Sequence, residues 1–361
     1  MAGAHRMVLE VEFFNEVGTG TGPTLEFYTL LSKELTQRAL GAWRDTEDPQ
    51  SPPALAAATT TATAAAATAD PVKPAAHVAY VYAPHGLFPA PARPGSFDAD
   101  VAGASGGSGL TRRDLFRLLG RVVGKALQDG RLLDLGLSPA FFRAVSGRTL
   151  ALADLAEVDP PLGRTLGQLA SAARRIAALR RAGAPEAEWR GVMVGGAAVE
   201  DLCLTFLLPG DDAHELRPGG ADVAVTAANL SDYVDAVVDA SVGGGIARQI
   251  EAFRAGLGDI LPSPALGVFT EAELDCVLCG QGQAWTPELL GECVTFDHGY
   301  TAQSPPVRAL VQVLCGYGPE EQRSFLRFVT GAPRLPPGGL AALQPRLTVV
   351  CKQPSGGGGG G

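Results

Sequence analysis

The fold is decided by the stretch Phe325-Leu-Arg-Phe-Val-Thr-Gly-Ala-Pro-Arg-Leu-Pro-Pro-Gly-Gly-Leu340, which continues as Ala341-Ala-Leu-Gln-Pro-Arg-Leu-Thr-Val-Val-Cys-Lys352. Its first part predicts a helix, because Phe325, Leu326 and Val329 recur at helical spacing before a glycine stop. Two prolines and two glycines then predict a rigid turn. The last six residues alternate in polarity, which is typical of a short strand.

This stretch is the most specific of the sequence. Three others accompany it, and they are Glu16-Val-Gly-Thr-Gly-Thr-Gly-Pro-Thr-Leu-Glu-Phe-Tyr28, Leu118-Leu-Gly-Arg-Val-Val-Gly-Lys-Ala-Leu-Gln-Asp-Gly-Arg-Leu-Leu133 and Phe296-Asp-His-Gly-Tyr-Thr-Ala-Gln-Ser-Pro-Pro306. With the first stretch, they resemble the C-terminal region of HECT-type ubiquitin-protein ligases. The resemblance is to the ubiquitin-fusion-degradation branch, which includes the thyroid-receptor-interacting ligases and their plant relatives. Several long motifs in one order argue against chance agreement.

The resemblance implies an α+β fold with a mainly helical N-lobe, a small hairpin-helix subdomain and an incomplete α/β C-lobe. We expect residues 1–47 to begin the N-lobe and residues 48–76, rich in Ala, Thr and Pro, to form a low-complexity linker. The N-lobe resumes over 77–280, and 281–361 holds the interlobe hinge, a truncated C-lobe and a glycine-rich tail.

Helix signals support this reading. Capping-box patterns at Thr111/Asp114 and at Thr270/Glu273, and Ser-Pro and Thr-Pro pairs at Ser138 and Thr286, predict four helix starts. A long helix over 161–182 carries a basic face, which we interpret as solvated surface. Alternation between Leu202 and Val225 predicts a hairpin with a second strand at Val223 and Val225, and Ser231 is expected to cap the helix that follows.

The family takes ubiquitin from a conjugating enzyme onto its own cysteine as a thioester and then passes it to a substrate lysine. The expected partners are therefore a ubiquitin-conjugating enzyme, ubiquitin and protein substrates. The subdomain at 204–242 resembles the one that receives the conjugating enzyme. On its helix, Tyr233 and Val237 are one turn apart and match groove-lining positions, although apolar residues at this spacing are also typical of core.

The family's nucleophile lies in a Thr-Cys loop that follows the final strand. Here Gln353-Pro-Ser355 is followed by six glycines up to Gly361, so we expect the catalytic cysteine to lie beyond Gly361 and assign none within the chain. Cys351 is interpreted as a structural thiol, because alternation places it on the strand face opposite Lys352. On this interpretation the chain alone is inactive, and the competing hypothesis is a binding module that docks a conjugating enzyme.

The other sulfur and imidazole groups are interpreted as structural. Cys276 and Cys279 form a C-x-x-C pair on an expected helix, but only Cys293 and His298, both distant, could complete a zinc site. We interpret the pair as core and His298 as part of a turn. No metal site and no cofactor are expected. Gly18 to Gly22 resembles a dinucleotide-binding turn only superficially, since Pro23 replaces the third glycine.

Composition limits the class of protein. The net charge of −9 and pI near 5.1 argue against nucleic-acid binding, and the 46% hydrophobic content is ample for a core. Six irregularly spaced cysteines and no apolar export segment predict a reduced protein of the cytoplasm or nucleus. No stretch is apolar enough to span a membrane, so we expect a soluble protein without membrane partners.

Overall fold

The computed structural model describes residues 9–14, 21–46, 79–93, 111–261 and 269–351. These residues form two compact units. The first unit takes the described residues up to Glu34, those of Leu118–Gly136 and those from Arg254 onward, and the second takes the described residues of Leu35–Arg117 and of Leu137–Phe253. The lobe boundaries expected from the sequence stay predictions. The glycine-rich turn at 18–22 lies mostly outside the described residues, of which Gly22 belongs to the first helix.

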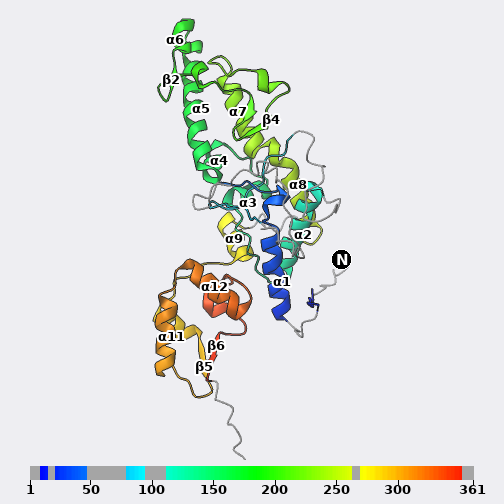
Figure 1. Cartoon of the computed structure of the whole chain (residues 1–361), viewed down its shortest axis with the longest axis vertical. Coiled ribbons are helices and arrows are strands. Elements are labelled where there is room, and N and C mark those ends of the chain that lie inside the picture. The colour runs from blue at the N-terminus through cyan, green and yellow to red at the C-terminus, as the bar shows by residue number, and fades with distance from the viewer. Residues whose placement is uncertain (1–8, 15–20, 47–78, 94–110, 262–268, 352–361) are drawn as a thin grey trace, which may run out of the picture. The chain divides into compact units, whose positions relative to one another are not determined.

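Helices dominate both units (Figure 1). The α-helices are α1 (Thr21–Glu34), α2 (Arg112–Asp129), α3 (Pro139–Val145), α4 (Leu152–Val158), α5 (Pro160–Arg181), α6 (Glu186–Arg190), α7 (Leu230–Val242), α8 (Gly244–Gly258), α9 (Glu271–Cys279), α10 (Pro287–Cys293), α11 (Pro305–Cys315) and α12 (Pro319–Thr330). None of the helices in the described ranges combines the length and the apolarity needed to cross a membrane.

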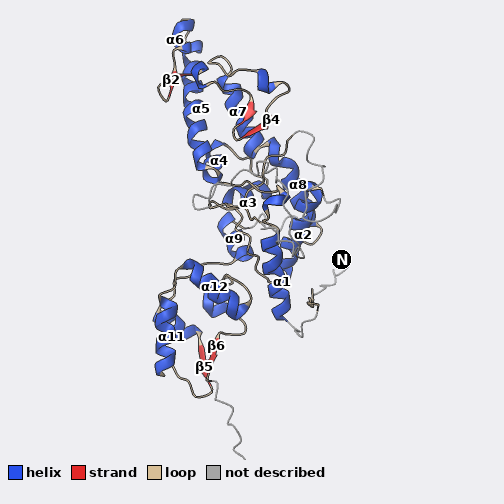
Figure 2. Cartoon of the chain, viewed as in Figure 1, coloured by secondary structure: helices blue, strands red, loops and turns tan. Residues whose placement is uncertain are grey.

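Strands are few and short (Figure 2). They are β1 (Met193–Val194), β2 (Ala197–Ala198), β3 (Leu207–Leu208), β4 (Asp211–Glu215), β5 (Thr295–Asp297) and β6 (Thr348–Val350). β1–β2 and β3–β4 are antiparallel pairs, whereas β5 and β6 are parallel, with Phe296 opposite Val349. The α+β class expected from the sequence is confirmed.

The predicted helix starts are confirmed by their hydrogen bonds. The Thr270 hydroxyl accepts from the Glu273 backbone N–H at 3.3 Å, and the Glu273 carboxylate accepts from the Thr270 N–H at 2.8 Å. Thr111 and Asp114 form the same reciprocal pair before α2. Ser138 likewise accepts from the N–H of Phe141. These bonds satisfy backbone donors that a helix leaves unpaired at its first turn.

The hairpin before α7 differs from the prediction. Only one bridge, between Thr205 and Ala224, joins the two segments that the alternation had paired, and β3 instead turns back onto β4. The predicted cap at Ser231 is wrong, because α7 begins at Leu230 with Asn229 before it. The Asn229 side chain accepts from the Thr226 N–H at 2.7 Å, so it stabilises the turn that leads into the helix.

The core of the second unit contains an aromatic cluster. The Trp43 ring lies edge-on to Phe116 and Phe141, with centroids 5.5 and 6.2 Å apart, and Phe141 meets Phe253 at 5.0 Å. The indole N–H of Trp43 donates to the Leu35 carbonyl at 2.7 Å. Aromatic edges packed on faces stabilise beyond their buried area. In the same unit, α4, α5 and α7 pack on one another.

In the first unit, the residues from 285 to 349 surround a core of their own. Its buried members are Trp285, Leu290, Cys293, Val294, Leu314, Leu326, Leu335 and Leu340. The ring of Phe325, from the stretch that decides the fold, packs on the Trp285 ring with their centroids 5.7 Å apart. α12 ends where predicted, since Gly331 adopts a left-handed φ of 78°.

Candidate functional site

The subdomain that follows α6 is built on an aromatic pair. Phe206, just before β3, lies edge-on to Tyr233 of α7, with ring centroids 5.6 Å apart. The guanidinium of Arg217 lies over the Phe206 ring, 3.6 Å from its centroid. Arginine over an aromatic face is attractive and shields the ring from water. The arrangement fixes α7 against the β3–β4 hairpin.

The two residues proposed for partner docking are both buried. Tyr233 is 2% exposed and Val237 is 0% exposed, and burial raises the pKa of the Tyr233 phenol. In this structure they therefore shape the subdomain from inside, and neither side chain lies on its surface. That Tyr233 and Val237 contribute to docking of a conjugating enzyme stays a prediction. As buried residues, they would do so by setting the shape of the subdomain surface that covers them.

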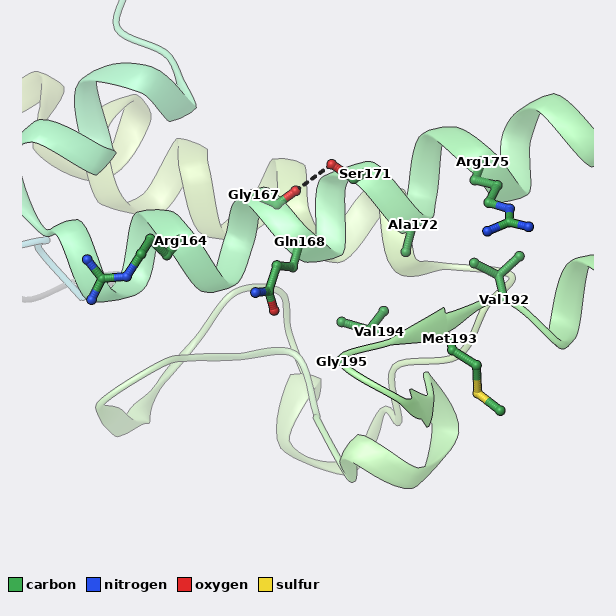
Figure 3. Close-up of a pocket in the computed structure, with 10 residues that line it drawn as sticks. All are labelled: Arg164, Gly167, Gln168, Ser171, Ala172, Arg175, Val192, Met193, Val194 and Gly195. Atoms are coloured by element: carbon green, nitrogen blue, oxygen red, sulfur yellow. Dashed lines mark hydrogen bonds between the residues drawn. The ribbon is translucent and has the colours of Figure 1, made fainter.

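A groove lies between α5 and β1, as Figure 3 shows. Its volume is about 560 Å³, and its lining residues are Arg164, Gly167, Gln168, Ser171, Ala172, Arg175, Val192, Met193, Val194 and Gly195. Met193 is 59% exposed, unusual for so large an apolar side chain. Sequence analysis missed this groove because a two-residue strand has no periodicity to read, although it did single out the basic face of the helix.

A second hollow in the same unit is polar. It encloses about 480 Å³ and is lined by Ala92, Arg93, His214, Glu215, Leu216, Ala236, Asp239, Ala240, Gly244, Gly245, Arg248 and Gln249. The Nδ1 atom of His214 and the Oε1 atom of Gln249 are buried without a hydrogen-bond partner among the described residues. Burial lowers the pKa of His214, so its imidazole is neutral at physiological pH.

All six cysteines are free thiols. Those of the C-x-x-C pair point to different partners, since the Cys279 thiol donates to the Leu135 carbonyl at 2.6 Å and the Cys276 thiol lies 3.6 Å from the Gln281 side-chain oxygen. In the described ranges no three His, Cys, Asp or Glu side chains lie close enough to hold a metal ion. His298 is exposed in a turn with a left-handed φ of 54°.

Cys351 follows β6 and is half-buried. The Cys351 side chain is the main cause of the raised pKa of the Tyr300 phenol. Its backbone N–H donates to the Asp297 carbonyl at 3.4 Å. Among residues 269–351, no imidazole, ammonium or guanidinium is bonded to the Cys351 sulfur, and a nucleophilic thiol needs such a neighbour to lower its pKa.

The segment from Gly280 to Ala284, which the resemblance predicts to be a hinge, is held by two hydrogen bonds. The Gln281 N–H donates to the Leu335 carbonyl at 2.9 Å, and the Gln283 side chain accepts from the Leu340 N–H at 3.0 Å. Both partners belong to the proline-glycine turn of the stretch that decides the fold. The turn and the hinge are therefore one structural element.

The family model described as HECT-domain (ubiquitin-transferase) matches residues 29–356. The E3 ubiquitin-protein ligase UPL3 of Arabidopsis thaliana is 44% identical over 98% of this chain and 18% of its own length. The E3 ubiquitin-protein ligase TRIP12 of Danio rerio is 37% identical over 97% of this chain and 16% of its own length. The chain thus spans about a fifth of the length of these relatives.

Proposed function

Because the chain belongs to the HECT-domain (ubiquitin-transferase) family, we propose that it serves in protein ubiquitination by receiving a ubiquitin-conjugating enzyme on the subdomain from Leu204 to Val242. Ubiquitin and protein substrates are the further partners of this proposal. The chemistry is transfer of ubiquitin through a cysteine thioester to a lysine, which splits one acyl transfer into two steps. The six free thiols suit a reducing compartment, cytoplasm or nucleus.

The packing of α7 on Phe206 supports this proposal. A docking surface must keep its shape before the partner arrives, because ordering it on binding costs affinity. Val237, with no exposed surface, and Tyr233, held at the ring edge of Phe206, give the subdomain this rigidity. The surface of α7 also carries Asp232 and Asp235, which are exposed and would attract a basic partner.

The ubiquitin-carrying thiol is, in our proposal, none of the six cysteines. Cys279 and Cys293 are buried, and the Cys279 thiol is already used on a backbone carbonyl. Cys351 has a phenol rather than a base as its neighbour. Each of these environments suits a structural thiol.

Docking is tested with a matched pair of core variants. Val237→Ala and Val145→Ala remove the same two methyl groups, from α7 and from α3, where Val145 is 5% exposed. Each is expected to lower the free energy of unfolding by about 1–2 kcal/mol. Only Val237→Ala is expected to weaken binding of a labelled ubiquitin-conjugating enzyme, by about fivefold or more, measured by fluorescence anisotropy.

The comparison separates docking from stability. If both variants bind the conjugating enzyme as the unmodified chain does, or both lose binding equally, then Val237 does not shape a docking surface. Tyr233→Phe keeps the ring that packs on Phe206 and is expected to bind normally.

A further inference from the structure

Three arginines share a single carboxylate in the first unit. The Oδ1 atom of Asp134 lies 2.6 Å from Nη2 of Arg323 and 3.8 Å from Nε of Arg334. Its Oδ2 atom lies 3.3 Å from Nη2 of Arg327. Arg323 and Arg327 are one turn apart on α12, and Arg334 follows the end of that helix. The fold therefore directs three positive charges onto the two oxygens of one side chain.

One carboxylate is too little to satisfy these three guanidiniums. Together the guanidiniums carry about fifteen N–H donors, whereas a carboxylate accepts about four. Among the residues that the structure describes, the other carboxylate within reach of the three is that of Glu320, 3.7 Å from Arg323. The Glu320 side chain is 86% exposed, so solvent screens its charge. The arginines and Asp134 thus leave a surplus of two positive charges.

The unused donors of the cluster face water. The side chains of Arg327, Arg323 and Arg334 are 55%, 36% and 26% exposed, whereas that of Asp134 is 14% exposed. An anion that arrives from solvent would therefore meet the guanidiniums before the carboxylate. The whole chain has a net charge of −9, so this surplus is a local exception on an acidic protein.

We propose that the arginine cluster, formed by Arg323, Arg327 and Arg334, binds the phosphate group of a phosphomonoester. Such a group carries a charge of about −1.5 to −2 at pH 7, which matches the surplus of the cluster. Its three terminal oxygens accept from the planar forks of arginine, each of which can hold two oxygens at once. A carboxylate, with a single charge, would leave half of the surplus uncompensated.

A single phosphate suits this cluster better than a nucleic acid does. The cluster is small, and the negative charge of the whole chain repels a long phosphate backbone. A phosphate that binds only the folded chain also stabilises it, because binding shifts the unfolding equilibrium. The cluster shares no residue with the segment at 204–242 proposed for conjugating-enzyme docking, so the two proposals can fail independently.

The probe is a fluorescein-labelled peptide of glycines and serines with one central phosphoserine, titrated with the full chain and followed by fluorescence anisotropy. Arg327→Gln and Arg334→Gln are each expected to weaken its binding at least fivefold. Arg121→Gln is the matched control, because Arg121 is 49% exposed on α2 of the same unit and has Asp259 as its own partner at 2.7 Å. This variant makes the same charge change and is expected to stay within twofold.

The chemistry and the source of the phosphate are tested on the unmodified chain. Peptides with serine or with glutamate in place of the phosphoserine are expected to bind at least tenfold more weakly. Inorganic phosphate is expected to displace the phosphopeptide. A phosphopeptide that binds tenfold more tightly than inorganic phosphate would identify a phosphorylated protein segment as the source, and equal affinity would identify a small phosphorylated molecule.

Three outcomes would overturn the proposal. They are no saturable binding of the phosphopeptide, an equal loss in Arg327→Gln and Arg121→Gln, or equal binding of the glutamate peptide. Thermal melts followed by circular dichroism confirm that each variant is folded. In the same melts, inorganic phosphate is expected to raise the Tm of the unmodified chain more than that of Arg327→Gln, and this difference removes the general stabilising effect of phosphate salts.

Discussion

Gly280→Ala is expected to lower the free energy of unfolding by about 3 kcal/mol, because two penalties add at this position. Gly280 has φ 75° and ψ −177°, a backbone region that only glycine occupies readily. In addition, a Cβ atom placed there would overlap the carbonyl oxygen of Leu335 and lie 3.0 Å from a methyl group of Leu132. The backbone would have to move away from Leu335.

The matched control is Gly130→Ala in the same unit. Gly130 also has a left-handed φ of 63°, but a Cβ atom there meets nothing within 4 Å. Gly130→Ala is therefore expected to lower the free energy of unfolding only through backbone strain, by about 1 kcal/mol. Urea denaturation of both variants measures the difference, and equal costs would mean that the close approach to Leu335 does not constrain the chain.

A further consequence falls on residues 280–284, which the resemblance predicts to be a hinge. Moving the backbone at Gly280 would break the bond from the Gln281 N–H to the Leu335 carbonyl, which joins this segment to the proline-glycine turn. Hinges absorb their backbone changes at a few residues, so the variant would alter the predicted hinge at its first residue.

Asp134→Ala is expected to lower the free energy of unfolding by about 2 kcal/mol. The Asp134 carboxylate is 14% exposed and pairs with Arg323 at 2.6 Å, Arg327 at 3.3 Å and Arg334 at 3.8 Å. Its removal leaves three guanidiniums close together without their shared anion. The arginines are partly exposed, and solvent screening therefore reduces the cost below that of a buried pair.

Salt dependence identifies the cause of this effect. The unmodified chain is expected to lose stability on going from low to 0.5 M salt more steeply than Asp134→Ala, because salt screens the attraction that the variant has already lost. Asp259→Ala is the control, since Asp259 meets Arg121 at 2.7 Å and its side chain, at 32%, is more exposed than that of Asp134; about 0.5 kcal/mol is expected. If urea denaturation gave the same loss of unfolding free energy for both variants, Asp134 would not act as the common anion of its three arginines.

The helices could be predicted from the sequence because their signals are local. Ser138, Thr270 and Thr286 each bond to a backbone N–H three residues ahead, and such a bond needs no tertiary partner. The β3–β4 pairing could not be predicted in this way. β4 reads Asp-Asp-Ala-His-Glu, with no alternation of apolar residues, and its pairing depends on its contact with β3.

The candidate sites also divide into features that the sequence indicates and features that depend on the folded chain. The resemblance pointed to Tyr233 and Val237, and their helical spacing is that of a buried face or of a groove alike. Only the packing of Phe206 on Tyr233 distinguishes these two cases. The groove of α5 was out of reach, because the helix residue Ala172 and the strand residue Val194 are far apart in sequence and both line it only in the folded chain.

The most direct test of the proposed function follows ubiquitin itself. The purified chain is incubated with a ubiquitin-conjugating enzyme charged with labelled ubiquitin and run on a non-reducing gel beside Cys351→Ala. We predict that the chain binds the conjugating enzyme in a pull-down and forms no reductant-sensitive ubiquitin adduct on any of its six cysteines. An adduct that disappears in Cys351→Ala, or a chain that binds no conjugating enzyme, would contradict the account.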